Sequence, residues 1–124
     1  MGLTRVDVEP ELPLVAQLAA PIQGPVVSTN RYHVVAGDED AFVAAWRAEV
    51  SYLSRQPGYL GAELYRGIGG SKVFFNLASW QSAASLMAAG DSDRFRALIA
   101  AFPPSRCYPH LVQPIALDGD QAGR

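Results

Sequence analysis

Two side chains in one apolar segment, Asn76 and Trp80, are the first candidates for chemistry. The segment from Lys72 to Trp80 reads as a β-strand, and residues four apart project from the same face of a strand. A buried amide without a partner costs roughly 1–3 kcal/mol, so Asn76 needs a hydrogen-bond partner or a ligand. The indole and the amide together suit a planar substrate that carries a carbonyl or phenol. The alternative is structural: Asn76 bonds to backbone, and Trp80 fills the core.

Further polar and aromatic residues lie in neighbouring segments. Asn30 is a second amide in a predicted strand, and it can share a cavity with Asn76 if the two strands are adjacent. Tyr32 and Tyr65 are phenols near the same sheet, although a single strand tyrosine is more often structural. Phe74 shares the face of Asn76 on its strand, and Trp46 is expected in the core, where it can also back the cavity.

The other candidate motifs give weaker indications of function. His33 has the opposite parity to Asn30 and should face the other way, and His110 sits between two prolines without an evident partner. With these two histidines and one cysteine, no metal site is expected. The glycine-rich run 67–72 lacks the spacing of a phosphate-binding loop and is expected to be a hairpin turn.

The elements that must position these residues follow in a definite order. The sequence predicts strands over 26–35, 59–66, 72–80 and 107–115. One helix begins at 37–40 and stops before Pro57-Gly58, and a pair of short helices fills the stretch from Ser82 to Phe102. Pro109 and Pro114 favour a sheet edge for the last strand. This order is the βαββαβ pattern of a ferredoxin-like α+β domain, with an antiparallel sheet and helices on one face.

Such a sheet leaves its second face bare. In the strand 72–80, Val73, Phe75 and Leu77 point to one side, and the other side is also mostly apolar. Helices cover one side, and the sheet of a second copy is the natural cover for the other. We therefore expect a homodimer that forms a dimeric α+β barrel.

Length and composition fit this picture. The 124 residues suggest one domain over 26–116, an N-terminal arm over 1–25 and a polar tail over 117–124. The arm contains four prolines and is expected to hold at most a turn or two of helix and to reach across to the partner. Charged residues make up 18%, below the ~25% usual for soluble domains, which favours a buried subunit interface.

The charge pattern and the cysteine content exclude several functional classes. The net charge is −2 and the basic residues are scattered, which argues against nucleic acid as a partner. One cysteine, Cys107, makes a reducing cytoplasm the default, and no segment reads as a signal peptide or a membrane span.

Three stretches together resemble a known family. These are the helix start from Gly37 to Trp46, the strand from Gln56 to Arg66, and Phe75-Asn-Leu-Ala-Ser-Trp-Gln-Ser82. They are similar to antibiotic biosynthesis monooxygenases over about residues 25–115, and the strand motif Asn-x-Ala-x-Trp is the most specific part. The resemblance implies a dimeric α+β barrel, which agrees with the element order.

The resemblance also implies an activity. Members that act on aromatic polyketides oxidise anthrone-like or phenolic rings to quinones with O2 and without a cofactor or metal. On this basis we expect catalytic roles for Asn76, Trp80 and Asn30, and substrate binding by Tyr65, Tyr32, Trp46 and Phe74. The expected partners are a small aromatic substrate, O2 and a second copy of the chain.

Relatives of the family leave alternatives. Heme-degrading relatives need a histidine on the helix after the tryptophan, and the stretch from Gln81 to Phe102 contains none. A polyketide cyclase would use the same cavity for ring closure. In a ligand-binding dimer without activity, Asn76 and Trp80 would recognise the ring without turnover.

Overall fold

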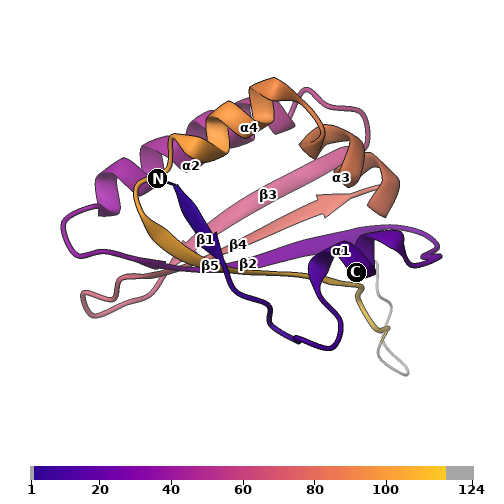
Figure 1. The fold of residues 1–124 in the computed structure, drawn as a ribbon, viewed down its shortest axis with the longest axis horizontal. Helices are drawn as coiled ribbons and strands as arrows, with labels where there is room; N and C mark the ends of the chain where they lie inside the picture. Colours follow the sequence, from indigo (N-terminus) through magenta and orange to yellow (C-terminus); the bar gives the residue numbers. More distant parts are fainter. Residues whose placement is uncertain (1, 117–124) are drawn as a thin grey trace.

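The computed structural model describes residues 2–116, which form one five-stranded sheet and four helices (Figure 1). The predicted tail, 117–124, lies outside the described residues. In chain order the elements are β1 (Leu3–Arg5), α1 (Leu14–Ala19), β2 (Val26–Val34), α2 (Glu39–Leu53), β3 (Tyr59–Arg66), β4 (Val73–Trp80), α3 (Ala83–Gly90), α4 (Asp93–Ala100) and β5 (Ser105–Val112).

The sheet has the strand order β1-β5-β2-β4-β3. The pairs β5–β2, β2–β4 and β4–β3 are antiparallel, and β3 and β4 form the predicted hairpin around the glycine-rich turn. The ferredoxin-like α+β prediction is therefore confirmed. Its consequence for the site is that β2 and β4, which carry Asn30 and Asn76, lie side by side.

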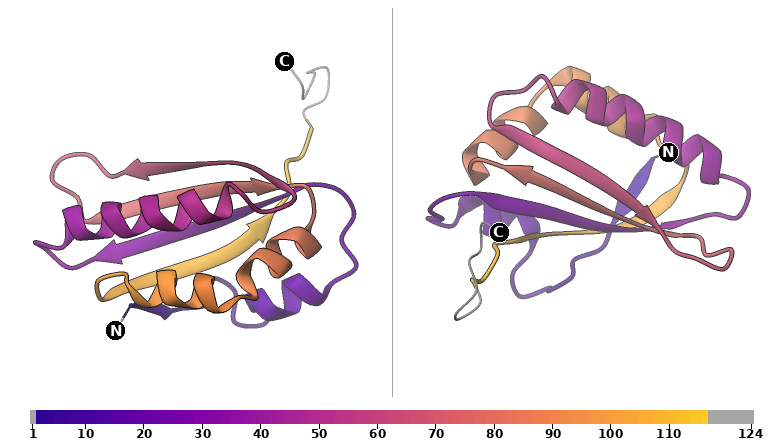
Figure 2. Two further views of the ribbon diagram at one scale, coloured as in Figure 1. Left: turned by 90° about the horizontal axis from the view of Figure 1, so that it is seen from above. Right: turned by 180° about the vertical axis from the view of Figure 1, so that it is seen from behind.

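Helices α2, α3 and α4 lie over one face of this sheet (Figures 1 and 2). Ser82 and Ser92 begin α3 and α4, because each hydroxyl accepts a hydrogen bond from a backbone N–H three residues on. The turn after α2 needs Gly58, which has φ +87° and comes so close to Ser85 that a Cβ would lie 2.5 Å from that side chain.

Two clusters of buried side chains fill the space between helices and sheet. One gathers around Trp80, with Val26, Leu53 and Ala78, and the other around the packed rings of Tyr32, Phe42, Phe74 and Phe102. Along β2 and β4, the pair Asn30–Asn76 lies in register between these two apolar groups. The polar pair thus separates the two halves of the core.

No helix of residues 2–116 lies over the opposite face of the sheet (Figure 1). Phe75 is 46% exposed and Leu77 is 37% exposed there, while Phe74 and Trp80, on the other side of β4, are buried. The alternation predicted for this strand is confirmed. Tyr65 on β3 and Val112 on β5 add to the exposed apolar side chains, and we call this surface the open face.

The N-terminal arm departs from the prediction. It contains the single short helix expected, α1, but it folds onto its own sheet: β1 pairs with β5 in parallel, and α1 packs against β5 and α3. The expectation that the arm also reaches across to a partner subunit stays a prediction.

The predicted edge position of the last strand is also only half right. Residues 105–107 of β5 pair with β1, so β5 begins inside the sheet. Beyond Cys107, none of the described residues forms a strand on that side of β5. Pro109 lies in this unpaired part, where a backbone N–H is not needed for pairing with a neighbouring strand.

Among the described residues, no helix is both long enough and apolar enough to cross a membrane.

Candidate active site

The centre of the site is a pair of asparagines on adjacent strands. Asn30 on β2 stands directly opposite Asn76 on β4, and on its other side it stands opposite Pro109 on β5. All three side chains lie on the face that the helices cover, since each shares the parity of buried neighbours such as Tyr32, Phe74 and Leu111. The structure thus brings the two predicted amides together.

Trp46 fixes the orientation of Asn76. Its indole Nε1 on α2 donates a 2.9 Å hydrogen bond to Asn76 Oδ1. This bond occupies the carbonyl oxygen of the amide and leaves its Nδ2 group as an available donor. Trp46 does not line the cavity itself, so the structure places it behind Asn76 instead of against a substrate.

Trp80 and Asn30 each hold a polar atom without a partner among the described residues. These atoms are the indole Nε1 of Trp80, a donor, and Oδ1 of Asn30, an acceptor. The Trp80 ring is fully buried and packs edge-on against Tyr59 at 5.5 Å between ring centroids. A buried polar atom without a hydrogen bond costs roughly 1–3 kcal/mol, and such atoms in native proteins call for a functional explanation.

These groups surround a cavity of about 480 Å³ between the sheet and the helices. Three parts of the chain contribute walls. From the sheet come Ser28, Asn30, Tyr32, Asn76, Ala78, Trp80 and Pro109; from the covering helices and the α3–α4 turn come Glu49, Leu53, Leu86, Met87, Gly90, Asp91, Phe95 and Ile99; and from the arm come Leu3, Arg5, Leu14 and Leu18. The lining is mainly apolar with a few polar groups, as in sites for small organic ligands.

One side chain of the arm, Gln17, ties helix α1 to strand β5 beside this cavity. Gln17 on α1 accepts a 2.8 Å bond from the backbone N–H of Leu111 and donates a 2.9 Å bond to the Leu111 carbonyl. It thereby pairs with the edge of β5 as a strand would. This contact brings α1 to the cavity, where Leu14 and Leu18 form part of the wall.

Two of the expected binding residues lie elsewhere. Phe74 is buried in the aromatic cluster, 4.8 Å from the Phe42 ring, and does not line the cavity. Tyr65 is on the open face, where its hydroxyl donates to Glu63. The register explains this, because Tyr65 pairs with the exposed Phe75 and not with Asn76.

Among the expected substrate-binding residues, Tyr32 does line the cavity, and it is nearly fully buried. Burial and then the Glu49 carboxylate raise the pKa of Tyr32 well above its usual value, while Asn30 and Arg5 lower it by smaller amounts. Its hydroxyl therefore stays protonated at neutral pH.

Glu49 was not singled out as a site residue from the sequence. It lies on α2, lines the cavity, and has no hydrogen bond or ion pair in the described part of the chain. Burial raises its pKa from 4.5 to about 7. The available signal was its spacing, because Glu49 falls on the same helical stripe as Phe42, Trp46 and Leu53.

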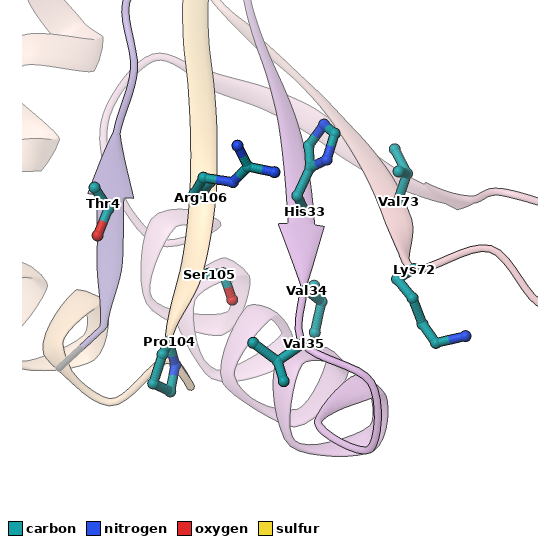
Figure 3. Close-up of a pocket in the computed structure, with 9 residues that line it drawn as sticks. All are labelled: Thr4, His33, Val34, Val35, Lys72, Val73, Pro104, Ser105 and Arg106. Carbon is teal, nitrogen blue, oxygen red and sulfur yellow. The ribbon is translucent and has the colours of Figure 1, made fainter.

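The histidines face away from this cavity. His33 lies in a second hollow of about 420 Å³ at the other end of β2, with Arg106, Lys72 and Thr4 (Figure 3). Arg31 Nε donates to His33 Nε2 at 3.0 Å, and burial followed by Arg31 and Arg106 lowers the His33 pKa. His110 lies near Gln17 and Glu9, on the arm side of β5.

Within residues 2–116, no three histidine, cysteine, aspartate or glutamate side chains are grouped so that they could hold a metal ion.

The family of the chain follows from its matched region. The model of the antibiotic biosynthesis monooxygenase family matches residues 25–101, which include both asparagines, Trp80 and Glu49. The chain belongs to this family. The match begins at the end of the arm, so β1 and α1 are outside it. The sequence-based resemblance is thereby confirmed.

Several solved structures have the same fold as this antibiotic biosynthesis monooxygenase family member. SnoaB, a cofactor-independent oxygenase from Streptomyces nogalater, superposes with a TM-score of 0.71 at 21% identity, covering 76% of this chain and 96% of SnoaB. A suggested monooxygenase from Shewanella loihica PV-4 gives a TM-score of 0.64 at 26% identity and covers 77% of this chain and 99% of its own. A conserved protein from Methanosarcina mazei Go1 gives a TM-score of 0.61 at 12% identity and covers 71% of this chain and 92% of its own. No curated protein matches the chain.

Proposed function

We propose that this family member is a cofactor-independent monooxygenase that oxidises a planar phenolic or anthrone-like aromatic polyketide to a quinone with O2. The observation that carries the proposal is the cavity of about 480 Å³ in which Asn30, Asn76 and Trp80 meet. Its volume lies in the range of roughly 300–1,000 Å³ that small-molecule sites occupy.

The arrangement of polar groups supports this activity. A planar ring fits beside the Trp80 indole, between the two apolar halves of the core. The Nδ2 group of Asn76, oriented by Trp46, is a donor for the oxygen of an enolate or phenolate. Donors fixed in a partly dry cavity stabilise a developing oxyanion more strongly than water does.

The chemistry uses the substrate as its own reductant. An anthrone carbon loses a proton, and the resulting enolate gives one electron to O2, which becomes superoxide. The radical pair recombines to a carbon–oxygen bond, and protonation gives a hydroperoxide. The second carbon-bound hydrogen then leaves as a proton, and the O–O bond of the peroxide breaks to release hydroxide. The products are a carbonyl group and one water. The residues named above bind the ring, stabilise the oxyanion and limit water.

We further propose that the protein works as a homodimer joined through the open face. Phe75, Leu77 and Tyr65 give this face a row of exposed apolar groups, and a second copy would bury them. The buried thiol of Cys107 is compatible with a cytoplasmic location, which we also propose.

Oxygen consumption tests the activity directly. Purified, metal-free protein should take up O2 with an anthrone such as emodinanthrone, and Asn76→Ala and Trp80→Ala should each lower kcat/KM about 100-fold or more, as loss of an oxyanion donor does. Gln81→Ala, at an exposed position next to Trp80, is the matched control and should keep the wild-type rate.

Other outcomes would point elsewhere. If the wild type takes up no oxygen, the monooxygenase proposal fails, and binding of the anthrone without uptake would favour a ligand-binding dimer or a cyclase. Full activity in both site variants would refute the site assignment while leaving the family intact.

A further inference from the structure

One ionisable side chain inside the cavity has no partner to explain it. Glu49 stands on α2 one turn beyond Trp46, the residue that orients Asn76. Its carboxylate faces the same cavity as Asn30 and Asn76, and no described residue donates a hydrogen bond to it or forms an ion pair with it. Carboxylates without partners are rarely kept in partly buried positions unless they have a function.

The titratable groups near Glu49 come from four elements around the cavity. Arg5 on β1, Tyr32 on β2 and Asp91 at the end of α3 line the same cavity as Glu49. The buried Cys107 thiol on β5 does not line the cavity, but it is near enough to interact electrostatically with Glu49. Arg5 is largely solvent-exposed, and it forms no ion pair with Glu49. The immediate surroundings of the Glu49 carboxylate are therefore mainly apolar.

The other titratable groups are unsuited to accept a proton from a substrate. Burial raises the pKa values of both Tyr32 and Cys107, so both remain protonated at neutral pH. His33 lies on the far side of the sheet, and Asp91 is exposed beside Arg96. Glu49, with a pKa of about 7, changes its charge in the range where a general base is most effective.

We propose that Glu49 is the general base that removes the substrate proton in this cavity, an inference that rests on the proposed function. Its carboxylate accepts the proton from the anthrone carbon or the phenol hydroxyl, and the electron pair of that bond stays on the substrate as an enolate or phenolate. The amide of Asn76 donates to the resulting oxyanion. The protonated Glu49 later returns its proton to the peroxide anion that forms when the substrate combines with O2. The carboxylate thus regenerated takes the second carbon-bound proton as hydroxide leaves, and this proton joins the hydroxide to give water.

The pH dependence of turnover tests this role. In the wild type, kcat/KM for the anthrone should rise with pH through about 7 and then level off, because only the carboxylate form accepts a proton. Glu49→Gln should lower kcat/KM about 100-fold or more and remove that rise. Glu49→Asp, which keeps a shorter carboxylate, should restore part of the activity together with the pH dependence. Glu11→Gln, the same change at an exposed arm position, should match the wild type.

A second measurement does not depend on turnover. In protein labelled with ¹³C at the glutamate carboxyl carbons, one resonance should titrate near pH 7, and it should be absent from Glu49→Gln. Titration of that resonance near pH 4.5 would overturn the proposal, as would an unchanged pH profile in Glu49→Gln. Absence of oxygen uptake in the wild type would instead defeat the monooxygenase function itself, so the two failures are distinct.

Discussion

Trp46 acts on the candidate site through a single hydrogen bond, from its Nε1 to Asn76 Oδ1 at 2.9 Å. Trp46→Phe removes the donor and keeps an aromatic ring in the core. We expect a loss of roughly 1–2 kcal/mol in the free energy of unfolding, because the buried Asn76 oxygen loses its partner. We also expect a lower kcat, since the amide is no longer fixed. Urea unfolding and steady-state oxygen uptake measure the two effects.

A double-mutant cycle shows whether Trp46 acts through Asn76. In the Asn76→Ala background, Trp46→Phe should lower kcat much less than it does in the wild type, because the shared bond is already lost. Equal, additive losses of kcat in the two backgrounds would contradict this arrangement.

Because its pKa is raised in the folded protein, Glu49 should make the free energy of unfolding decrease as the pH rises. Its folded pKa of about 7 lies above its ordinary value of 4.5, so between these pH values the folded protein holds more protons than the unfolded chain. This contribution to stability is complete below about pH 4.5 and falls as the pH rises to about 7. The stability of Glu49→Gln relative to wild type should therefore increase by roughly 1–3 kcal/mol from pH 5 to pH 8.

Chemical unfolding at several pH values checks this expectation. Subtracting the wild-type curve from the variant curve removes the contributions of other titrating groups, and Glu11→Gln serves as the exposed control. A difference between Glu49→Gln and wild type that stays constant with pH would show that Glu49 ionises as it would in water.

At the residue scale, the sequence predicted the asparagine pair but not the acid. Strand parity and adjacency were enough to place Asn30, Asn76 and Trp80 on one face, because a strand has a fixed period of two. The face on which Tyr65 lies depends on the register between β3 and β4, which includes an irregularity between Tyr59 and Gly61. The role of Glu49 depends on the shape of a cavity to which distant segments contribute, and local spacing does not reveal that shape.

At the scale of elements, the strands of the hairpin and the central helix were predictable, whereas β1 was not. The strand β1 has only three residues, Leu3–Arg5, and it exists because β5 offers an edge about a hundred residues later. So short a strand has no detectable period, and its stability comes from tertiary pairing alone.

The attachment of α1 to β5 depends on Gln17, and Gln17→Ala tests it. Loss of the side chain leaves the Leu111 N–H without the 2.8 Å acceptor that now satisfies it. Hydrogen exchange at the Leu111 amide should therefore become at least tenfold faster. Gln23→Ala is the matched control, since the Gln23 side chain makes no hydrogen bond among the described residues. Unchanged exchange at Leu111 would mean that other contacts hold the arm.

At the scale of the whole molecule, the open face is the surface through which we propose that the homodimer forms. Leu77→Lys places a charge in the middle of the exposed apolar row and should convert the proposed dimer to a monomer, because a desolvated lysine without a partner opposes association. Sedimentation equilibrium measures the result. Ile68→Lys makes the same kind of change in the hairpin turn, at a side chain that is 94% exposed, and should leave the dimer intact. A monomeric wild type, or a dimeric Leu77→Lys, would contradict the proposed interface.

The way the arm is joined to the domain bears on how substrate range can evolve. Leu3, Arg5, Leu14 and Leu18 form one wall of the cavity, yet they precede the residues that match the family. The pair Asn30–Asn76, which we propose to be catalytic, is held by strands β2 and β4, whose register does not involve the arm. Substitutions in the arm can therefore reshape the cavity without changing the register that places Asn30 beside Asn76. We expect libraries randomised at these four positions to alter ring-size preference more readily than libraries directed at the sheet.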